Sequence, residues 1–289
     1  MKFSGSAMII LAAICWGITG GLADILMGKG WDPLVISFYR GVIGLAFFLV
    51  WLLVSRKDHS GFSASLVLWS VVAGIGVAGN FTFYFLSIQS ASVPVAATLM
   101  YTAPLFVLLI SFLFRLERST WFKWACIFSV LIGIVLLTEA YDAGSGTVNF
   151  IGVATGLGAG LSYALFIFGF KNASARGKPQ MVLVIAFLAF CVILSLLVNF
   201  QEAASVPVSS DVGWFVAIGI IGAGLSFALY TIGIRQTEAS TASMIAMVEP
   251  VTASLFGILL LNEELSLVQL LGMAVILLTV TTLSVKKGD

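Results

Sequence analysis

The stretches TAPLFVLLISFLFRLER, at positions 102–118, and VEPVTASLFGILLLNEE, at positions 248–264, decide the fold of this 289-residue chain. Each has a proline, then a long apolar run, then a glutamate, so Pro104 aligns with Pro250 and Glu117 with Glu263 at one ungapped offset. The same offset of 146 positions pairs Pro33 with Pro179, Gly76 with Gly222 and Tyr84 with Tyr230. Because self-similarity at a fixed period marks an internal repeat, we predict two related halves, residues 1–146 and 147–289.

Composition points to a membrane protein. Apolar residues make up 60% of the chain and charged residues 9%, whereas soluble domains have about 45–50% and about 25%. So few charged groups cannot cover a water-soluble globule of this size. The net charge of +1 gives no field that would attract nucleic acid, so we expect the lipid bilayer and no nucleic acid as partners.

Ten apolar runs have about the 20 residues that a membrane-spanning helix needs. They are Ser6–Met27, Leu34–Val54, Leu66–Ser87, Pro94–Phe114, Thr120–Thr138, Val148–Phe170, Met181–Asn199, Val212–Ile234, Ser240–Leu261 and Ser266–Val285. Only short polar segments connect them. The sequence therefore predicts an all-α integral membrane protein with ten transmembrane helices and no soluble domain.

Basic residues predict the orientation, because cytoplasmic segments carry the excess of Lys and Arg. With the N-terminus inside, 12 of the 14 basic residues fall on inner segments, while Lys29 lies on an outer one and Arg40 within the second helix. Most acids, among them Asp32, Asp211 and Glu263, fall on outer segments. We therefore predict that both termini are cytoplasmic.

Five helices in each half make the second half enter the membrane upside down. The charges agree, since Glu117 lies between Arg115 and Arg118 on the inner side while Glu263 lies outside. Inverted repeats are typical of secondary transporters, whose solute site lies near the bilayer midplane between the repeats. The pattern thus predicts a small-solute transporter with five plus five transmembrane helices.

Four residues at membrane depth are candidate hinge or coupling residues. Pro104 and Pro250 each remove a backbone donor within a helix, which predicts a kink that is either used in gating or static. Glu249 is either a proton-coupling site or a hydrogen-bonded group beside the backbone acceptors that Pro250 frees. Arg40 could bind a solute carboxylate, pair with Asp24 or extend toward the membrane surface.

Polar, aromatic and thioether side chains follow one face of several predicted helices. Small residues packing helix against helix explain most of the 29 glycines, but amide and phenol groups at depth need polar partners. We therefore expect a solute cavity lined by Trp16, Asn80, Tyr84, Met100, Tyr101, Tyr163, Ser243, Met244 and Met247.

Enzyme and cofactor motifs are missing from the sequence. Cys15, Cys126 and Cys191 lie in apolar runs without metal-ligand spacing, and the single histidine, His59, lies in a predicted inner loop. No zinc-protease helix and no glycine-rich phosphate loop occur. We expect no catalysis, no cofactor, no metal and no ATP-driven transport.

Several motifs give each half a resemblance to the EamA domain of the drug/metabolite transporter superfamily. They are Trp16-Gly17, Arg40, Thr102-Ala103-Pro104, Leu116-Glu117-Arg118 before Trp121, Gly133-Ile134-Val135-Leu136-Leu137, Val248-Glu249-Pro250, Leu261-Asn262-Glu263-Glu264 and Gly272-Met273. The resemblance implies ten helices and a cavity lined mainly by helices 1, 3, 4, 6, 8 and 9. It also implies export of amino acids or related metabolites, and sometimes of toxic cations.

The resemblance narrows some expectations and opens others. Within the family the chain is most similar to bacterial exporters of aromatic amino acids. Glu249-Pro250 and Glu263 resemble fold signatures of the family, which favours a structural role for Glu249. Ser162-Tyr163 stands where a Trp-Ala pair is usual, which leaves the role of Tyr163 open.

The combined expectation is a bacterial inner-membrane exporter of small amphipathic metabolites, above all aromatic or neutral amino acids. It would work as a monomer by alternating access. One alternative is a multidrug or organic-cation exporter, for which Glu249 is the candidate carboxylate. A second alternative, from a different class, is a passive channel, and a membrane enzyme or receptor is the least favoured.

Overall fold

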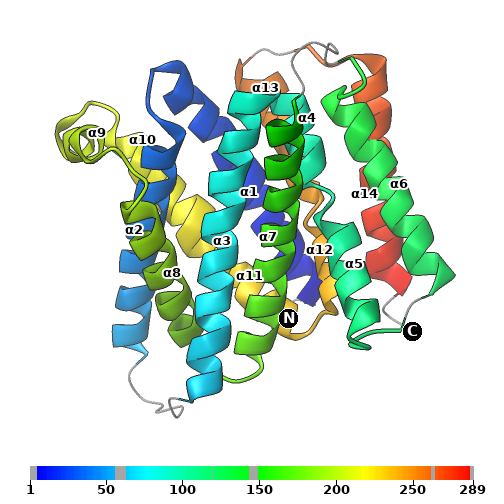
Figure 1. The fold of residues 1–289 in the computed structure, drawn as a ribbon, viewed down its shortest axis with the longest axis horizontal. Coiled ribbons are helices and arrows are strands. Elements are labelled where there is room, and N and C mark those ends of the chain that lie inside the picture. Colours follow the sequence, from blue (N-terminus) through cyan, green and yellow to red (C-terminus); the bar gives the residue numbers. More distant parts are fainter. Residues whose placement is uncertain (1–4, 56–62, 119, 143–148, 262–263, 287–289) are drawn as a thin grey trace.

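The computed structural model describes residues 5–55, 63–118, 120–142, 149–261 and 264–286, and all regular elements within these ranges are helices (Figure 1). The N-terminal elements are α1 (Gly5–Gly28), α2 (Pro33–Val54), α3 (Ala64–Ser90), α4 (Val93–Met100), α5 (Ala103–Leu113) and α6 (Trp121–Thr138). The C-terminal elements are α7 (Phe150–Ser174), α8 (Pro179–Ser195), α9 (Phe200–Ser205), η1 (Val206–Val208), α10 (Val212–Gly219), the π-helix η2 (Ile220–Leu225), α11 (Ser226–Arg235), α12 (Ala239–Ile245), α13 (Val248–Leu261) and α14 (Leu267–Lys286).

The outer surface of the bundle is apolar. Large side chains such as Phe112, Leu188, Leu259 and Leu278 are exposed along the helices. A backbone in lipid must satisfy its own hydrogen bonds, and helices do this within one segment. The chain is therefore a multi-pass membrane protein.

Within the described ranges, eight helices are long and apolar enough to span a membrane, or nine if α8 and α9–η1 count as one bent span. The seventh predicted run ends earlier than expected, because α8 stops at Ser195 and the chain turns by 115°. Asn199 then starts α9 by accepting hydrogen bonds from the first backbone N–H groups. In α14 the apolar segment among the described side chains is Leu267–Leu283, and ten spans stay a prediction.

The two paired prolines each lie in the first turn of a helix that follows a break. Pro104 is the second residue of α5, after the break at Tyr101 and Thr102, and Pro250 is the third residue of α13, after a break at Ala246 and Met247. The first N–H groups of a helix have no intrahelical partner, so proline costs little there. The fourth and ninth runs are thus each built as two helical segments.

Two paired glycines let helices approach closely. A Cβ at Gly76 of α3 would lie 2.5 Å from the backbone nitrogen of Phe166 in α7. A Cβ at Gly222, inside the π-helix, would lie 2.5 Å from the side-chain oxygen of Thr19 in α1. Both helix contacts therefore require glycine.

The two ends of the bundle hold different sets of loops. At one end Trp31 bonds Asp211, and the Asp32 backbone N–H donates to Glu202. At the other end α1 begins and α14 ends (Figure 1). The loops around Trp31 and Asp211, both predicted to lie on the outer side of the membrane, are thus in contact. The basic segments at 1–4, 56–62 and 287–289, and Glu263 with them, lie outside the described residues.

Candidate functional site

A cavity of about 610 Å³ extends from the middle of the bundle toward the end where α1, α3 and α6 finish. Met27, Gln89, Pro94 and Thr138, all near helix ends, line its outer part. The inner part reaches Trp16 of α1, and residues of α2, α3, α7, α11 and α13 complete the wall. This volume falls within the range of about 300–1,000 Å³ typical of small-molecule sites.

The structure places most of the predicted site residues on this wall. Those on the wall are Trp16, Asn80, Tyr84, Met100, Tyr101 and Tyr163, together with Arg40, Glu249 and Pro250. They come from α1, α2, α3, α4, α7 and α13 and from the break after α4. Residues far apart in the chain thus share one wall.

Four predicted residues lie elsewhere. Ser243, Met244 and Met247 belong to α12 and the break that follows it, and all three are fully buried. Pro104 is buried in α5. All seven residues of α12 are buried, because this short helix packs against α1, α5, α6, α7 and α14. It lies at the end opposite the cavity mouth and occupies space that the sequence pattern assigned to the cavity.

Aromatic rings line the deepest part of the cavity. The Trp16 ring lies 5.1 Å from Phe227 and 6.3 Å from Phe166, measured between ring centroids. Tyr163 lies edge-to-face against Phe166 at 4.4 Å. Phe166 and Phe227 were not predicted, since phenylalanine in an apolar helix looks the same in sequence whether it faces lipid or a cavity.

Asn80 links helices as well as lining the cavity. Its side-chain nitrogen donates to the Ala159 carbonyl of α7 at 3.1 Å. Seven residues further along α3, Ser87 donates to the Gly152 carbonyl at 2.7 Å. The polar face of α3 thus holds α7 in place, and the Asn80 amide is fixed in its orientation.

Three charged residues line the cavity: Asp24, Arg40 and Glu249. Arg40 donates to the Thr19 carbonyl at 3.4 Å, and its guanidinium lies 5.2 Å from the Phe81 ring centroid. Glu249 accepts a bond from the Tyr163 hydroxyl at 3.4 Å, and the Tyr101 hydroxyl also interacts with it. Its carboxylate is thus bonded to side chains that line the cavity.

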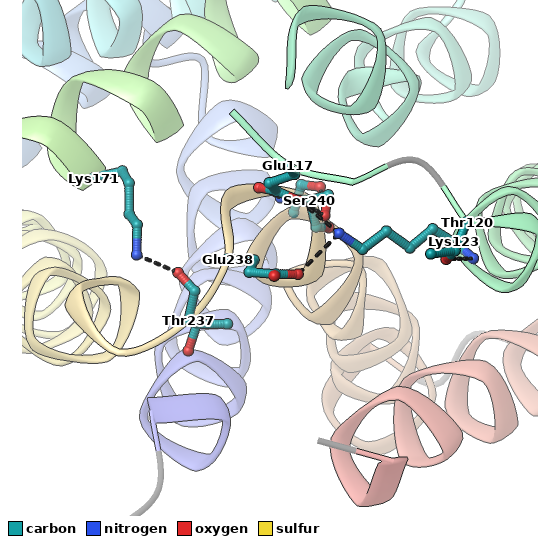
Figure 2. Close-up of polar contacts among 8 residues, drawn as sticks. Glu117, Thr120, Lys123, Lys171, Thr237, Glu238 and Ser240 are labelled. Atoms are coloured by element: carbon teal, nitrogen blue, oxygen red, sulfur yellow. Dashed lines mark hydrogen bonds and ion pairs between the residues drawn. The ribbon is translucent and has the colours of Figure 1, made fainter. Parts of the chain in front are cut away.

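A polar network joins loops and helices at the end of the bundle opposite the mouth (Figure 2). Lys123, in the first turn of α6, contacts Glu117 and Glu238 at 2.9 Å each. Glu117 also accepts hydrogen bonds from the hydroxyl and, at 3.2 Å, from the backbone N–H of Ser240. We call Glu117, Lys123, Glu238 and Ser240 the seal network, because it ties the α5–α6 loop and α6 to the start of α12.

Electrostatics support this network. Burial opposes the charged form of Glu117, but hydrogen bonds from Ser240 and Lys123 outweigh it and hold the pKa of Glu117 below its ordinary value. Beside it, Lys171 at the end of α7 donates to the carbonyls of Thr237 and Ile234 at 2.6 and 3.0 Å. A cation at the C-terminal end of α11 satisfies free carbonyls there.

A lipid-facing helical bundle around a solute-sized cavity that is open at one end defines a membrane transporter. The chain belongs to the EamA-like transporter family, whose family model matches residues 3–139 and again 150–285. The family and its transporter-named relatives point to transport, not catalysis.

The chain is similar over almost its full length to several curated proteins. It is 28% identical to an uncharacterized transporter of Archaeoglobus fulgidus, over 94% of this chain and 93% of that protein. It is also 28% identical to the threonine/homoserine exporter RhtA of Escherichia coli strain K12, over 97% and 92%. The uncharacterized transporter YwfM of Bacillus subtilis is 25% identical, over 96% and 93%.

A solved structure, described only as a crystal structure of a protein, shares the fold with a TM-score of 0.81 and 22% identity. The match covers 96% of this chain and 95% of the chain in that structure. The names of the curated relatives specify threonine and homoserine for the E. coli protein and no solute for the other two. The expected aromatic solute therefore stays a prediction.

Proposed function

We propose that this transporter exports small amphipathic metabolites, above all aromatic or neutral amino acids, by alternating access. The observation that carries the proposal is a cavity that opens toward one end of the bundle, while buried α12 and the seal network lie at the other end. Its wall combines aromatic rings with a few polar groups. Such a wall suits an apolar side chain attached to a polar head.

Helix packing supports two inverted halves of five helices, residues 1–146 and 147–289. The partners are exchanged between the halves: α3 packs on α7 and α8, while α10–α11 pack on α1 and α2. The paired glycines Gly76 and Gly222 lie in these equivalent contacts. Between α6 and α14, Gly133 and Gly272 each approach the other's carbonyl oxygen. This exchange is what a twofold relation between the halves would produce.

The excess of basic residues on the predicted inner segments supports placing the seal network on the cytoplasmic side of a bacterial inner membrane. The cavity then faces outward in this structure. Export requires the seal network to open so that a cytoplasmic solute can enter.

Lys123 has no basic equivalent in the second half, because the residue 146 positions later is Gln269, at the cavity mouth. The two ends therefore close by different contacts, within one monomer.

The solute class follows from the wall and from one relative. Arg40 is the only basic residue among those that line the described cavity, whereas a dicarboxylate or sugar phosphate would need several. RhtA of E. coli, a threonine/homoserine exporter by name, is 28% identical. Both observations favour amino acids with uncharged side chains.

One observation favours a second candidate function, export of organic cations. The Glu249 carboxylate lies on the cavity wall, where it could bind a cation directly. A passive channel is less favoured, because the seal network and buried α12 close one end of the path.

Flux measurements in proteoliposomes test the proposal. Labelled phenylalanine, threonine and tetraphenylphosphonium are compared, with and without a pH gradient. We expect accelerated flux of the amino acids and trans-stimulated counterflow. Tyr101→Ala should reduce that flux at normal expression, while Tyr141→Ala, an exposed tyrosine outside the cavity, should not. Flux of tetraphenylphosphonium alone would support the cation exporter, and no flux of any amino acid would refute the proposal.

A further inference from the structure

We propose that Arg40 and Glu249 form a two-pole subsite that selects a zwitterion, with Arg40 binding the solute carboxylate and Glu249 binding its ammonium group. The inference rests on the proposed function, because it assumes an amino acid as solute. It adds the residues that would recognise each end of that solute.

Arg40 has unused donors at the cavity wall. A guanidinium carries five N–H donors in a planar fork that matches a carboxylate. Within the part of the chain that the structure describes, Nη2 donates to the Thr19 carbonyl at 3.4 Å, and Nε has no hydrogen-bond partner. The Phe81 ring lies 5.2 Å from the guanidinium carbon and supports one face of the fork. The side chain is thus positioned, but its hydrogen-bonding capacity is mostly free for a ligand.

Glu249 likewise keeps capacity for a ligand. An ionised carboxylate has about four acceptor sites, and its bond to the Tyr163 hydroxyl is 3.4 Å, long for an O–H···O bond. Tyr101 interacts with the same carboxylate. The two tyrosines hold the carboxylate at the wall without saturating it.

Arg40 and Glu249 share the cavity wall with a second carboxylate, Asp24, and they do not contact each other as an ion pair. Ion pairs within 4.0 Å join Lys29 to Asp211 and Lys123 to Glu117 and Glu238, and these do not include Arg40 or Glu249. Charges at membrane depth are costly when unpaired. A zwitterion between Arg40 and Glu249 would bring an opposite charge to each of them, whereas a simple cation or anion would do so for only one of the two. The geometry therefore favours a neutral zwitterion over either ion.

Trp16 adds a third free polar group. Its indole nitrogen is buried without a hydrogen-bond partner, and the side chain lines the same cavity. An indole N–H is a donor only, so it can serve a solute oxygen. The ring also meets Phe227 and Phe166, which gives the solute side chain an aromatic surface beside the polar poles.

Binding of three matched solutes to the purified, full-length protein tests the subsite. Phenylalanine carries both charges, phenethylamine only the ammonium group and 3-phenylpropionate only the carboxylate. We expect the wild type to bind phenylalanine at least tenfold tighter than either analogue. Arg40→Gln should weaken phenylalanine by about 10- to 150-fold, the value of a hydrogen bond to a charged group, and leave phenethylamine unchanged or tighter. Glu249→Gln should weaken binding of phenylalanine by a similar factor and leave binding of 3-phenylpropionate unchanged or tighter.

Controls separate this inference from folding and from the proposed function. Arg176→Gln and Glu264→Gln each remove one exposed charge outside the cavity and should leave all three affinities unchanged. Arg40→Lys and Glu249→Asp keep the charges and should keep the zwitterion preference. If both neutral variants weaken all three solutes equally, the subsite is wrong while amino-acid transport stands. If the wild type binds no amino acid, the proposed function fails and the subsite with it.

Discussion

Replacing Glu117 with glutamine should open the sealed end of the cavity. The Glu117 side chain is 7% exposed and Lys123 is 13% exposed, so their contact at 2.9 Å is largely shielded from solvent. Glutamine keeps an acceptor for Ser240 but loses the charge that attracts Lys123, which is left with the half-exposed Glu238. Contacts of this kind contribute about 1.5–3 kcal/mol each.

The structure gives an expected magnitude for that opening. Because the amide retains part of the bonding to Ser240, we expect the sealed state to lose about 2–3 kcal/mol relative to the open one. A factor of ten corresponds to about 1.4 kcal/mol. The open population should therefore rise by about 30- to 150-fold.

A buried reporter measures this population. Ser243 in α12 is fully buried, and Ser243→Cys is a small change. With Cys15, Cys126 and Cys191 replaced, labelling by a membrane-impermeant maleimide reports access from the sealed end. When opening and closing are fast, the labelling rate follows the open population and should rise by the same factor. The control is Glu264→Gln, an exposed carboxylate between α13 and α14.

The reasoning fails if Glu117→Gln is folded, with an unchanged melting temperature, and still labels Ser243→Cys at the wild-type rate. In that case packing of α12 against its neighbours, and not the seal network, would keep the end closed. Faster labelling from the mouth side alone would also contradict the placement of the seal.

Three further predictions follow from the same structure. The pKa of Glu117 is lowered in the sealed state, so its contribution to the stability of that state is complete above the ordinary value of 4.5 and is lost as the pH falls below it. The labelling rate of Ser243→Cys should therefore be constant near neutral pH and rise only in acid. A rise centred near pH 7 would contradict this. Gly222→Val should destabilise the fold by about 1–3 kcal/mol, since its Cβ meets Thr19 at 2.5 Å, whereas Gly213→Ala has open space and should not; thermal unfolding of both in one detergent checks this. Trp16→Ala should weaken phenylalanine binding about 2- to 10-fold more than threonine binding, the value of an aromatic contact, while the half-exposed Trp214 replaced by alanine should affect neither; equal losses for both solutes would argue against stacking on Trp16.

Three predicted site residues lie away from the cavity for a common physical reason. The sequence pattern is symmetric, so it treated Ser243, Met244 and Met247 beside Pro250 like Met100 and Tyr101 beside Pro104. A single conformation is not symmetric: it opens the cavity along α4 and buries α12. Repeat-based reasoning therefore assigned both helices to the cavity, where the structure places only one.

Other features depended on which way a helix face turns. Phe166 and Phe227 lie in apolar runs that also contain lipid-facing residues, and only packing distinguishes the two environments. Asn80 and Tyr163 could be found in advance, because a polar group at membrane depth needs a partner. The partners themselves, Ala159 and Glu249, lie 79 and 86 positions away in the chain.

The sequence by itself determined the solvent, the helical class and the paired prolines, because hydropathy over about 20 residues and a repeat at one offset are properties of order along the chain. Tertiary structure alone decided which end of the cavity is open and what closes the other. Glu117, Lys123, Glu238 and Ser240 come from segments up to 123 positions apart, and their contacts exist only once α6 and α12 are packed together. The opposed charges of Arg40 and Glu249 share one wall for the same reason.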